Sequence, residues 1–345
     1  MRVPRRTPRS MRHALVALAG LAVLAGIAFF ARDAIDPAAL LEALAGAHVG
    51  WVVVSCALYL LSLVFLGQVW GCALRASLGA GPPAAQVQRA HWLSRAGAEV
   101  VPTPVADGIR VAALRRVPEA RGRTSEVIGS IGGFRLVDGV VGMGSALLLA
   151  LVIPLPADLN PLRWGAAAGL VASIAAALAV VALERRVVRS RPTGRAARGL
   201  RDVLRGAGVF RHRPDLLRAL GLQALTAGTR FVSMVALCLA FGLPAAAAAV
   251  AYLVATVASV LAITPGGAGV RELALVPLLV TAFGADTGVA LAFSLSIQGT
   301  GTLVVLAGAA VLALTVRRLP PPMPVETPDL APGDGATLEP ASGAG

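Results

Sequence analysis

Long apolar segments alternate with shorter, arginine-rich polar ones along most of the chain. Eight of them are long enough to be membrane-spanning helices, which need about 20 consecutive apolar residues. They lie at roughly 13–31, 50–74, 127–153, 164–183, 218–241, 245–263, 270–285 and 288–316. The pattern therefore predicts an all-α, polytopic membrane protein with about eight transmembrane helices.

The two ends of the chain differ from this apolar region. The arginine-rich stretch Arg2–Arg12 precedes the first apolar segment, as it does in a signal peptide. The apolar part, Ala14–Ala31, is longer than the usual signal core of about 7–15 residues, so we expect a retained first helix. From Leu319 the chain is rich in proline and glycine, and 319–345 is expected to form a disordered cytoplasmic tail. Residues 1–318 then form one integral membrane domain.

The placement of arginine predicts the orientation of these helices. With eight crossings both termini lie on one side, and 26 of the 31 arginines fall on that side. Arg32 and Arg163 fall on the other side, and Arg135, Arg230 and Arg271 fall within the spans. Because arginine-rich segments stay in the cytoplasm, we expect both termini and the linker 184–217 to be cytoplasmic.

Composition supports the membrane class and excludes others. The chain is 57% hydrophobic and 14% charged, whereas a soluble domain carries about 25% charged residues. The net charge of +13 follows the predicted topology and does not indicate a nucleic-acid partner. All 31 basic residues are arginine, which indicates a GC-rich genome and hence a bacterial plasma membrane. The cysteines and histidines show no metal-ligand spacing, so we expect neither a metal nor a cofactor.

Two stretches repeat one another 161 positions apart. Thr103–Leu114 and Thr264–Leu275 both read Thr-Pro-x-x-x-Gly-[Ile/Val]-Arg-x-x-Ala-Leu. The first supplies Pro104, Gly108 and Arg110. Transporters build polar sites from Pro/Gly-broken helices in corresponding positions of two halves, so the pair is a candidate internal repeat. Chance similarity in a chain rich in alanine and leucine is the alternative.

The surroundings of the motifs predict where they lie in the membrane. The first lies in 84–118, whose arginine density predicts a re-entrant or interfacial helix instead of a crossing. Four predicted crossings separate the two motifs, so both are expected to face the cytoplasmic side.

The second motif is the most specific local signal. An apolar helix is interrupted directly after Thr264 by a proline and three glycines: Pro265, Gly266, Gly267 and Gly269. The half-helix that follows then directs free N–H groups and its positive dipole end toward the break. Arg271 adds a positive charge, and Glu272 can neutralise it or take a proton, so phosphate is the expected guest. The alternative is a plain helical turn. No Gly-Lys-Ser/Thr follows, so nucleotide hydrolysis is not predicted.

Two ionisable residues share the third predicted span, where each costs about 2.5–3.5 kcal/mol on insertion scales. Arg135 and Asp138 are three residues apart, so they can pair on one helix face. They form either a neutral pair that locks two helices or the wall of a cavity that offers charge to a polar substrate.

Arg230 lies in a polar stripe on an otherwise apolar helix. Gln223, Thr226 and Ser233 share its face at steps of three and four residues. Such a stripe must face protein or water. It either holds neighbouring helices together or, because Arg230 has no local partner, binds an anion or a carboxylate.

Three of these elements together resemble the membrane region of lysylphosphatidylglycerol synthases. They are Thr264–Glu272, Arg135-Leu-Val-Asp138, and Pro104 with Gly108 and Arg110. The resemblance covers roughly residues 10–318, and stand-alone members of that family are called flippase-like proteins. It implies a transmembrane module that moves an anionic or aminoacylated phospholipid, or a glycolipid, between leaflets. In that family a separate soluble domain makes the lipid, so we expect a separately encoded lipid-modifying enzyme as a partner.

These features favour a flippase-like transporter whose cavity combines the two broken segments with Arg135, Asp138 and Arg230. One alternative is a membrane-embedded transferase acting on a lipid-linked substrate, with Glu272 or Asp138 as general base. Another is a non-catalytic partner of a lipid-modifying enzyme. The sequence has no Asp-x-Asp metal motif and no His–carboxylate pair of the kind that such transferases often use, so transport is favoured over an enzymatic activity.

Overall fold

The computed structural model describes residues 36–115, 117–153, 159–189, 195–261 and 270–316. Within these ranges the secondary structure is α-helical, with two short 3-10 turns and no strand. The helices are α2 (Pro37–Ala45), α3 (Val49–Leu78), α4 (Ala84–Ala98), α5 (Thr103–Leu114), α6 (Thr124–Val152), α7 (Asn160–Arg189), α8 (Arg195–Gly206), α9 (Arg213–Ala240), α10 (Ala245–Leu261), α11 (Val270–Phe283) and α12 (Thr287–Val316). The prediction of an all-α protein is confirmed.

Among the described residues, five helices are long and apolar enough to cross a membrane. They are α3, α6, α7, α9 and α12, and each matches one of the predicted spans to within a few residues. The predicted spans 245–263 and 270–285 correspond to α10 and α11, which have 17 and 14 residues. At 1.5 Å per residue the described parts of these helices are about 26 and 21 Å long, and both border residues 262–269, which lie outside the described ranges. The first predicted span, 13–31, and the predicted tail, 319–345, lie outside the described residues.

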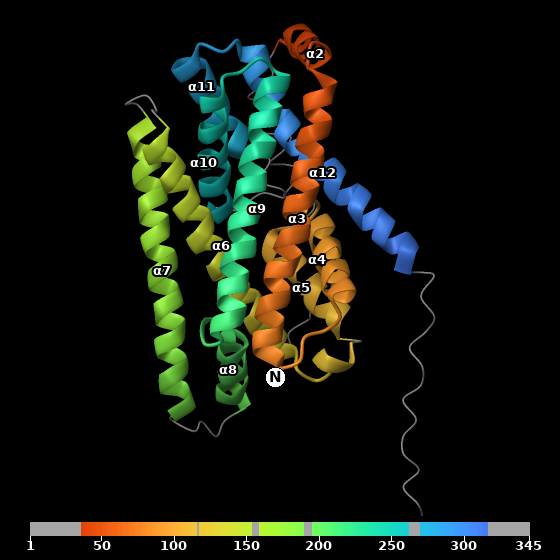
Figure 1. The fold of residues 1–345 in the computed structure, drawn as a ribbon, viewed down its shortest axis with the longest axis vertical. Coiled ribbons are helices and arrows are strands. Elements are labelled where there is room, and N and C mark those ends of the chain that lie inside the picture. Colours follow the sequence, from red (N-terminus) through yellow and green to blue (C-terminus); the bar gives the residue numbers. More distant parts are fainter. Residues whose placement is uncertain (1–35, 116, 154–158, 190–194, 262–269, 317–345) are drawn as a thin grey trace, which may run out of the picture.

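Helices α3 and α9 run antiparallel at the centre of the bundle (Figure 1). The Ser55 and Ser233 hydroxyls are 2.9 Å apart, whereas Arg75 lies 3.4 Å from Asp215 at the other end of the pair. The N–H of His48, which precedes α3, donates to the carbonyl of Ala240 at the end of α9. The residue numbers of the paired positions therefore fall along α9 as they rise along α3, as expected for antiparallel helices.

Eight of the eleven described helices fall into two sets of four with matching spacing. The first set is α3–α4–α5–α6 and the second is α9–α10–α11–α12. Helix α10 begins 161 residues after α4, the separation of the two sequence motifs, and α9 and α12 begin 164 and 163 residues after α3 and α6. The packing matches too, because α4 and α3 pack on α12 as α10 and α9 pack on α6. Since α3 and α9 run in opposite directions, the two sets have inverted orientations.

This inversion corrects one prediction. The pair α4–α5 follows the lower end of α3 and leads back to the lower end of α6, whereas α10–α11 connects the upper ends of α9 and α12 (Figure 1). The prediction that both motifs face the same side is therefore wrong. That prediction counts α10 and α11 as two crossings, whereas in the structure the pair begins and ends at the same end of the bundle.

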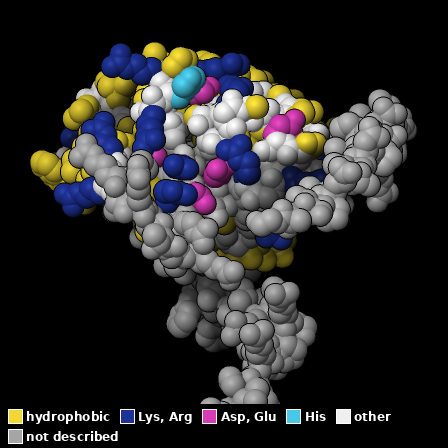
Figure 2. Space-filling model, turned by 90° about the horizontal axis from the view of Figure 1, so that it is seen from below, with side chains coloured by type: hydrophobic (Ala, Val, Ile, Leu, Met, Phe, Trp, Pro, Cys, Tyr) yellow, Lys and Arg dark blue, Asp and Glu magenta, His cyan; other side chains and the backbone are white. Residues whose placement is uncertain are grey.

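Arginines gather at the lower end of the bundle. Figure 2 shows them spread over this end when it is seen from below. The connections between helices there carry exposed arginines, among them Arg115, Arg121, Arg211 and Arg213. Asn160 begins α7 at the opposite end, and Arg163 lies in its first turn.

Helix α8 packs against α6 at this lower end through two glycines. A Cβ built on Gly129 would collide with the backbone of Val203 and Gly206, and one built on Gly206 would collide with Glu126 and Gly129. Only the absence of both side chains allows the two backbones to approach so closely.

We predict that Gly129→Ala lowers the melting temperature of the detergent-solubilised protein. The added methyl group forces α6 and α8 apart, at a cost of about 1–3 kcal/mol. Gly132→Ala on the same helix is the matched control, because a Cβ there meets open space. It should leave the melting temperature unchanged or raise it, since alanine is the better helix former. Equal melting temperatures for the two variants would contradict the packing described.

Candidate functional site

A cavity of about 400 Å³ lies between the two sets of helices. All eight helices of the two sets contribute to its lining. Its charged lining residues are Arg95, Arg110, Arg135, Arg230, Arg271, Glu99 and Asp138. The lining thus contains five arginines and two carboxylates. Both sequence motifs supply an arginine to it.

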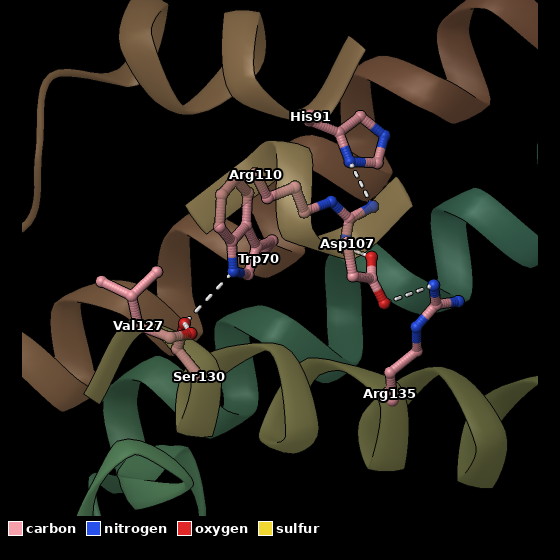
Figure 3. A network of polar contacts seen from close by, with 7 residues as sticks. All are labelled: Trp70, His91, Asp107, Arg110, Val127, Ser130 and Arg135. Carbon is pink, nitrogen blue, oxygen red and sulfur yellow. Dashed lines mark hydrogen bonds and ion pairs between the residues drawn. The ribbon is translucent and has the colours of Figure 1, made fainter. Parts of the chain in front are cut away.

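Arg110 is the most deeply buried of these arginines (Figure 3). One of its Nη atoms lies 3.1 Å from Nδ1 of His91, and the other lies 3.3 Å from Asp107. Its guanidinium carbon is 5.2 Å from the Trp70 ring centroid and 5.1 Å from that of Phe134. An ion pair and two cation–π contacts therefore offset the cost of burying the charge.

Arg135 donates a 3.0 Å hydrogen bond to the second oxygen of Asp107, so one carboxylate serves two arginines (Figure 3). Asp138 instead accepts a 2.6 Å hydrogen bond from Gln223 on α9. Of the two alternatives, the neutral Arg135–Asp138 pair is not observed, and both residues line the cavity. The spacing allowed that pair, but α5 and α9 each bring a partner from a different side of α6.

A second polar network surrounds Arg271. Arg271 donates to Glu272 at 2.7 Å and to Gln298 on α12 at 2.9 Å. Gln298 and Thr302 in turn donate to Glu99, the residue that follows α4, at 3.4 and 2.7 Å. The prediction that Glu272 can neutralise Arg271 agrees with this ion pair. The network joins the second motif to the end of α4, the helix that precedes the first motif.

The stripe on α9 faces protein, as predicted. Gln223, Thr226 and Ser233 are buried, and Ser233 bonds to Ser55. Arg230 lines the cavity, and its Nε is buried without a hydrogen-bond partner in the described part of the chain.

Other arginines of the lining also keep unused donors. The Nε atoms of Arg95, Arg110 and Arg271 are likewise buried without a hydrogen-bond partner among the described residues. A buried donor without a partner is costly, and guanidinium groups bind oxyanions well. The cavity therefore has the chemistry of an anion site.

The other predicted site residues do not contribute to the described lining. Pro104 lies in the first turn of α5 and starts that helix instead of breaking it, and Gly108 is exposed beside open space. Five predicted site residues of the second motif lie outside the described ranges: Thr264, Pro265, Gly266, Gly267 and Gly269. Their role at a helix break stays a prediction.

Sequence reasoning missed several polar groups of the cavity. Asp107 occupies a variable position of the first motif, three residues before Arg110, and that spacing could have identified it. The four-residue spacing of Arg95 and Glu99 is a similar signal. Gln298 gave none, because it lies within a long apolar helix. Among the described residues no three His, Cys, Asp or Glu side chains form a group that could hold a metal ion.

We predict that Asp107→Asn destabilises the folded protein strongly. It leaves Arg110 and Arg135 without their shared carboxylate, and removing one partner of a buried ion pair costs about 3–5 kcal/mol. Asp202→Asn is the control, since its pair with Arg201 is about one-third exposed and worth about 0–1 kcal/mol. Thermal unfolding in detergent would compare the two. An Asp107→Asn protein as stable as the control would contradict the role given to this carboxylate.

Comparison with known proteins agrees with the resemblance seen in the sequence. The family model described as the lysylphosphatidylglycerol synthase TM region matches residues 17–309. No curated protein matches the chain. The matched region covers most of the 345 residues and includes every residue that lines the cavity. The protein is a multi-pass membrane protein that belongs to the lysylphosphatidylglycerol synthase transmembrane-region family.

Proposed function

We propose that the protein is a flippase-like transporter that moves a phospholipid or another anionic lipid-linked substrate between leaflets. The observation that carries this proposal is the arginine-lined cavity between two inverted sets of helices. Many secondary transporters place their substrate site at the interface of inverted repeats, close to the middle of the membrane.

The short helix pairs support the same proposal. In our proposal α4–α5 and α10–α11 are re-entrant hairpins that enter from opposite sides and do not cross the membrane. Non-helical backbone at membrane depth is tolerated only where it is buried in protein or lines a polar cavity. Arg110 and Arg271 come from these hairpins and line the cavity, which fits a route for a polar head group.

A membrane-embedded transferase is less well supported. General-base catalysis needs a carboxylate that can accept a proton from the substrate. Asp138 accepts a hydrogen bond from Gln223, and Glu272 pairs with Arg271. Both carboxylates are therefore already engaged by side chains of the protein, which favours a role in binding.

We further propose that the arginine-rich lower end faces the bacterial cytoplasm, because positively charged connections stay on that side. Single cysteines in a protein without Cys56, Cys72 and Cys238 would test this. An impermeant thiol reagent should label Asn160→Cys in intact cells, whereas Arg213→Cys should react only after lysis. Labelling of Arg213→Cys from outside would contradict the orientation.

Arg271→Ala should slow lipid scrambling in proteoliposomes. It removes a charge-assisted contact of about 1.5–3 kcal/mol, which corresponds to about ten- to hundredfold in affinity. Glu272→Gln should cost less, because the arginine remains. Arg218→Gln, an exposed substitution at the arginine-rich end of α9, is the matched control and should scramble normally. All activities are normalised to monodisperse protein. If Arg271→Ala scrambled lipid at the wild-type rate, the cavity would not be part of the transport route.

A further inference from the structure

The cavity carries more positive than negative charge by any count of its described neighbours. Its lining has five arginines and two carboxylates, Glu99 and Asp138. Two more carboxylates touch lining arginines: Asp107 contacts Arg110 and Arg135, and Glu272 contacts Arg271. Even with all four carboxylates counted, one arginine is left in excess. In surroundings of low dielectric constant such an imbalance favours an anionic guest.

The carboxylates of the cavity already have partners. Glu99 accepts hydrogen bonds from Gln298 and Thr302, and Asp138 accepts one from Gln223. A cationic guest would have to displace these contacts while lying among five arginines.

The arginines, in contrast, have donor capacity to spare. Arg230 forms no ion pair among the described residues, and its Nε has no hydrogen-bond partner there. Arg110 and Arg271 occupy equivalent positions of the two motifs, so each half of the molecule supplies one buried guanidinium. A phosphate group, with several acceptor oxygens and at least one negative charge, matches this arrangement.

We propose that the cavity selects its cargo by charge. It binds a head group that contains a phosphate and no ammonium group, and it disfavours an aminoacylated head group. This inference rests on the proposed function and narrows its substrate class. A lysyl ester adds two ammonium groups to a phosphate with one negative charge, so the head group becomes a net cation. Such a head group is repelled by the excess arginine, whereas phosphatidylglycerol and phosphatidic acid are attracted.

Binding to the purified full chain in a neutral detergent tests the order of affinities. The probes are phosphatidic acid, phosphatidylglycerol, lysylphosphatidylglycerol and phosphatidylcholine with identical acyl chains, compared by native mass spectrometry. The two anionic lipids should bind about tenfold or more tightly than the lysylated one, which corresponds to one charge-assisted contact. Equal or tighter binding of lysylphosphatidylglycerol overturns the proposal.

Charge-changing variants test the mechanism of selection. Arg230→Gln should weaken phosphatidylglycerol binding about tenfold, with Arg218→Gln on the same helix as the unaffected control. Arg230→Lys should retain most of the affinity, because it keeps the charge. Glu99→Gln and Asp138→Asn raise the positive excess and should preserve or tighten binding of the anionic lipids. Selective loss of lysylphosphatidylglycerol binding in monodisperse Glu99→Gln or Asp138→Asn would show that the carboxylates receive an ammonium group, which overturns the proposal.

Two further arms separate this inference from the proposed function. Glycerol phosphate and inorganic phosphate are tested as competitors of phosphatidylglycerol. If either compound competes at the same concentration as the lipid, the cavity selects by charge but does not require a lipid. The proposed function then fails while charge selection holds. If lysylphosphatidylglycerol binds best and is scrambled in proteoliposomes, transport of lipid holds and charge selection fails.

Discussion

The arrangement of the first half depends on compensating the buried charge of Arg110. A guanidinium with so little exposure is stable only where a carboxylate, hydrogen-bond acceptors or aromatic rings surround it. Asp107 on the same helix, His91 on α4, and the rings of Trp70 on α3 and Phe134 on α6 provide these partners. Arg110 therefore holds α5 against three neighbouring helices. Asp107 extends the network to Arg135, which joins the hairpin to the wall of the cavity.

The antiparallel pair α3 and α9 turns this local arrangement into a cavity shared by both halves. Ser55 and Ser233 allow close contact at one end of the pair, and Arg75 with Asp215 fixes the other. Because the pair is antiparallel, the two helix sets are inverted and their hairpins approach from opposite ends. Arg110 and Arg271, which are far apart in the chain, therefore line one space.

The two halves neutralise their arginines differently. The first half shares the Asp107 carboxylate between two arginines, whereas the second pairs Arg271 with its neighbour Glu272. Gln298 and Thr302 connect Arg271 to Glu99 of the first half, so the networks of the two halves meet across the cavity. A guest that binds the arginines therefore contacts both halves at once.

The sequence by itself determined the positions of the long helices and most of the charged lining. Charged residues are expensive in apolar segments, so Arg135, Asp138, Arg230 and Arg271 could be identified from the sequence without knowing their neighbours. The 161-residue spacing of the motifs likewise anticipated the matching helix sets. Only the tertiary structure decided that Arg135 pairs with Asp107, and that α10 and α11 return to the end from which they started. Helical periodicity fixes which residues share a face, whereas the partner opposite that face depends on how separate helices pack.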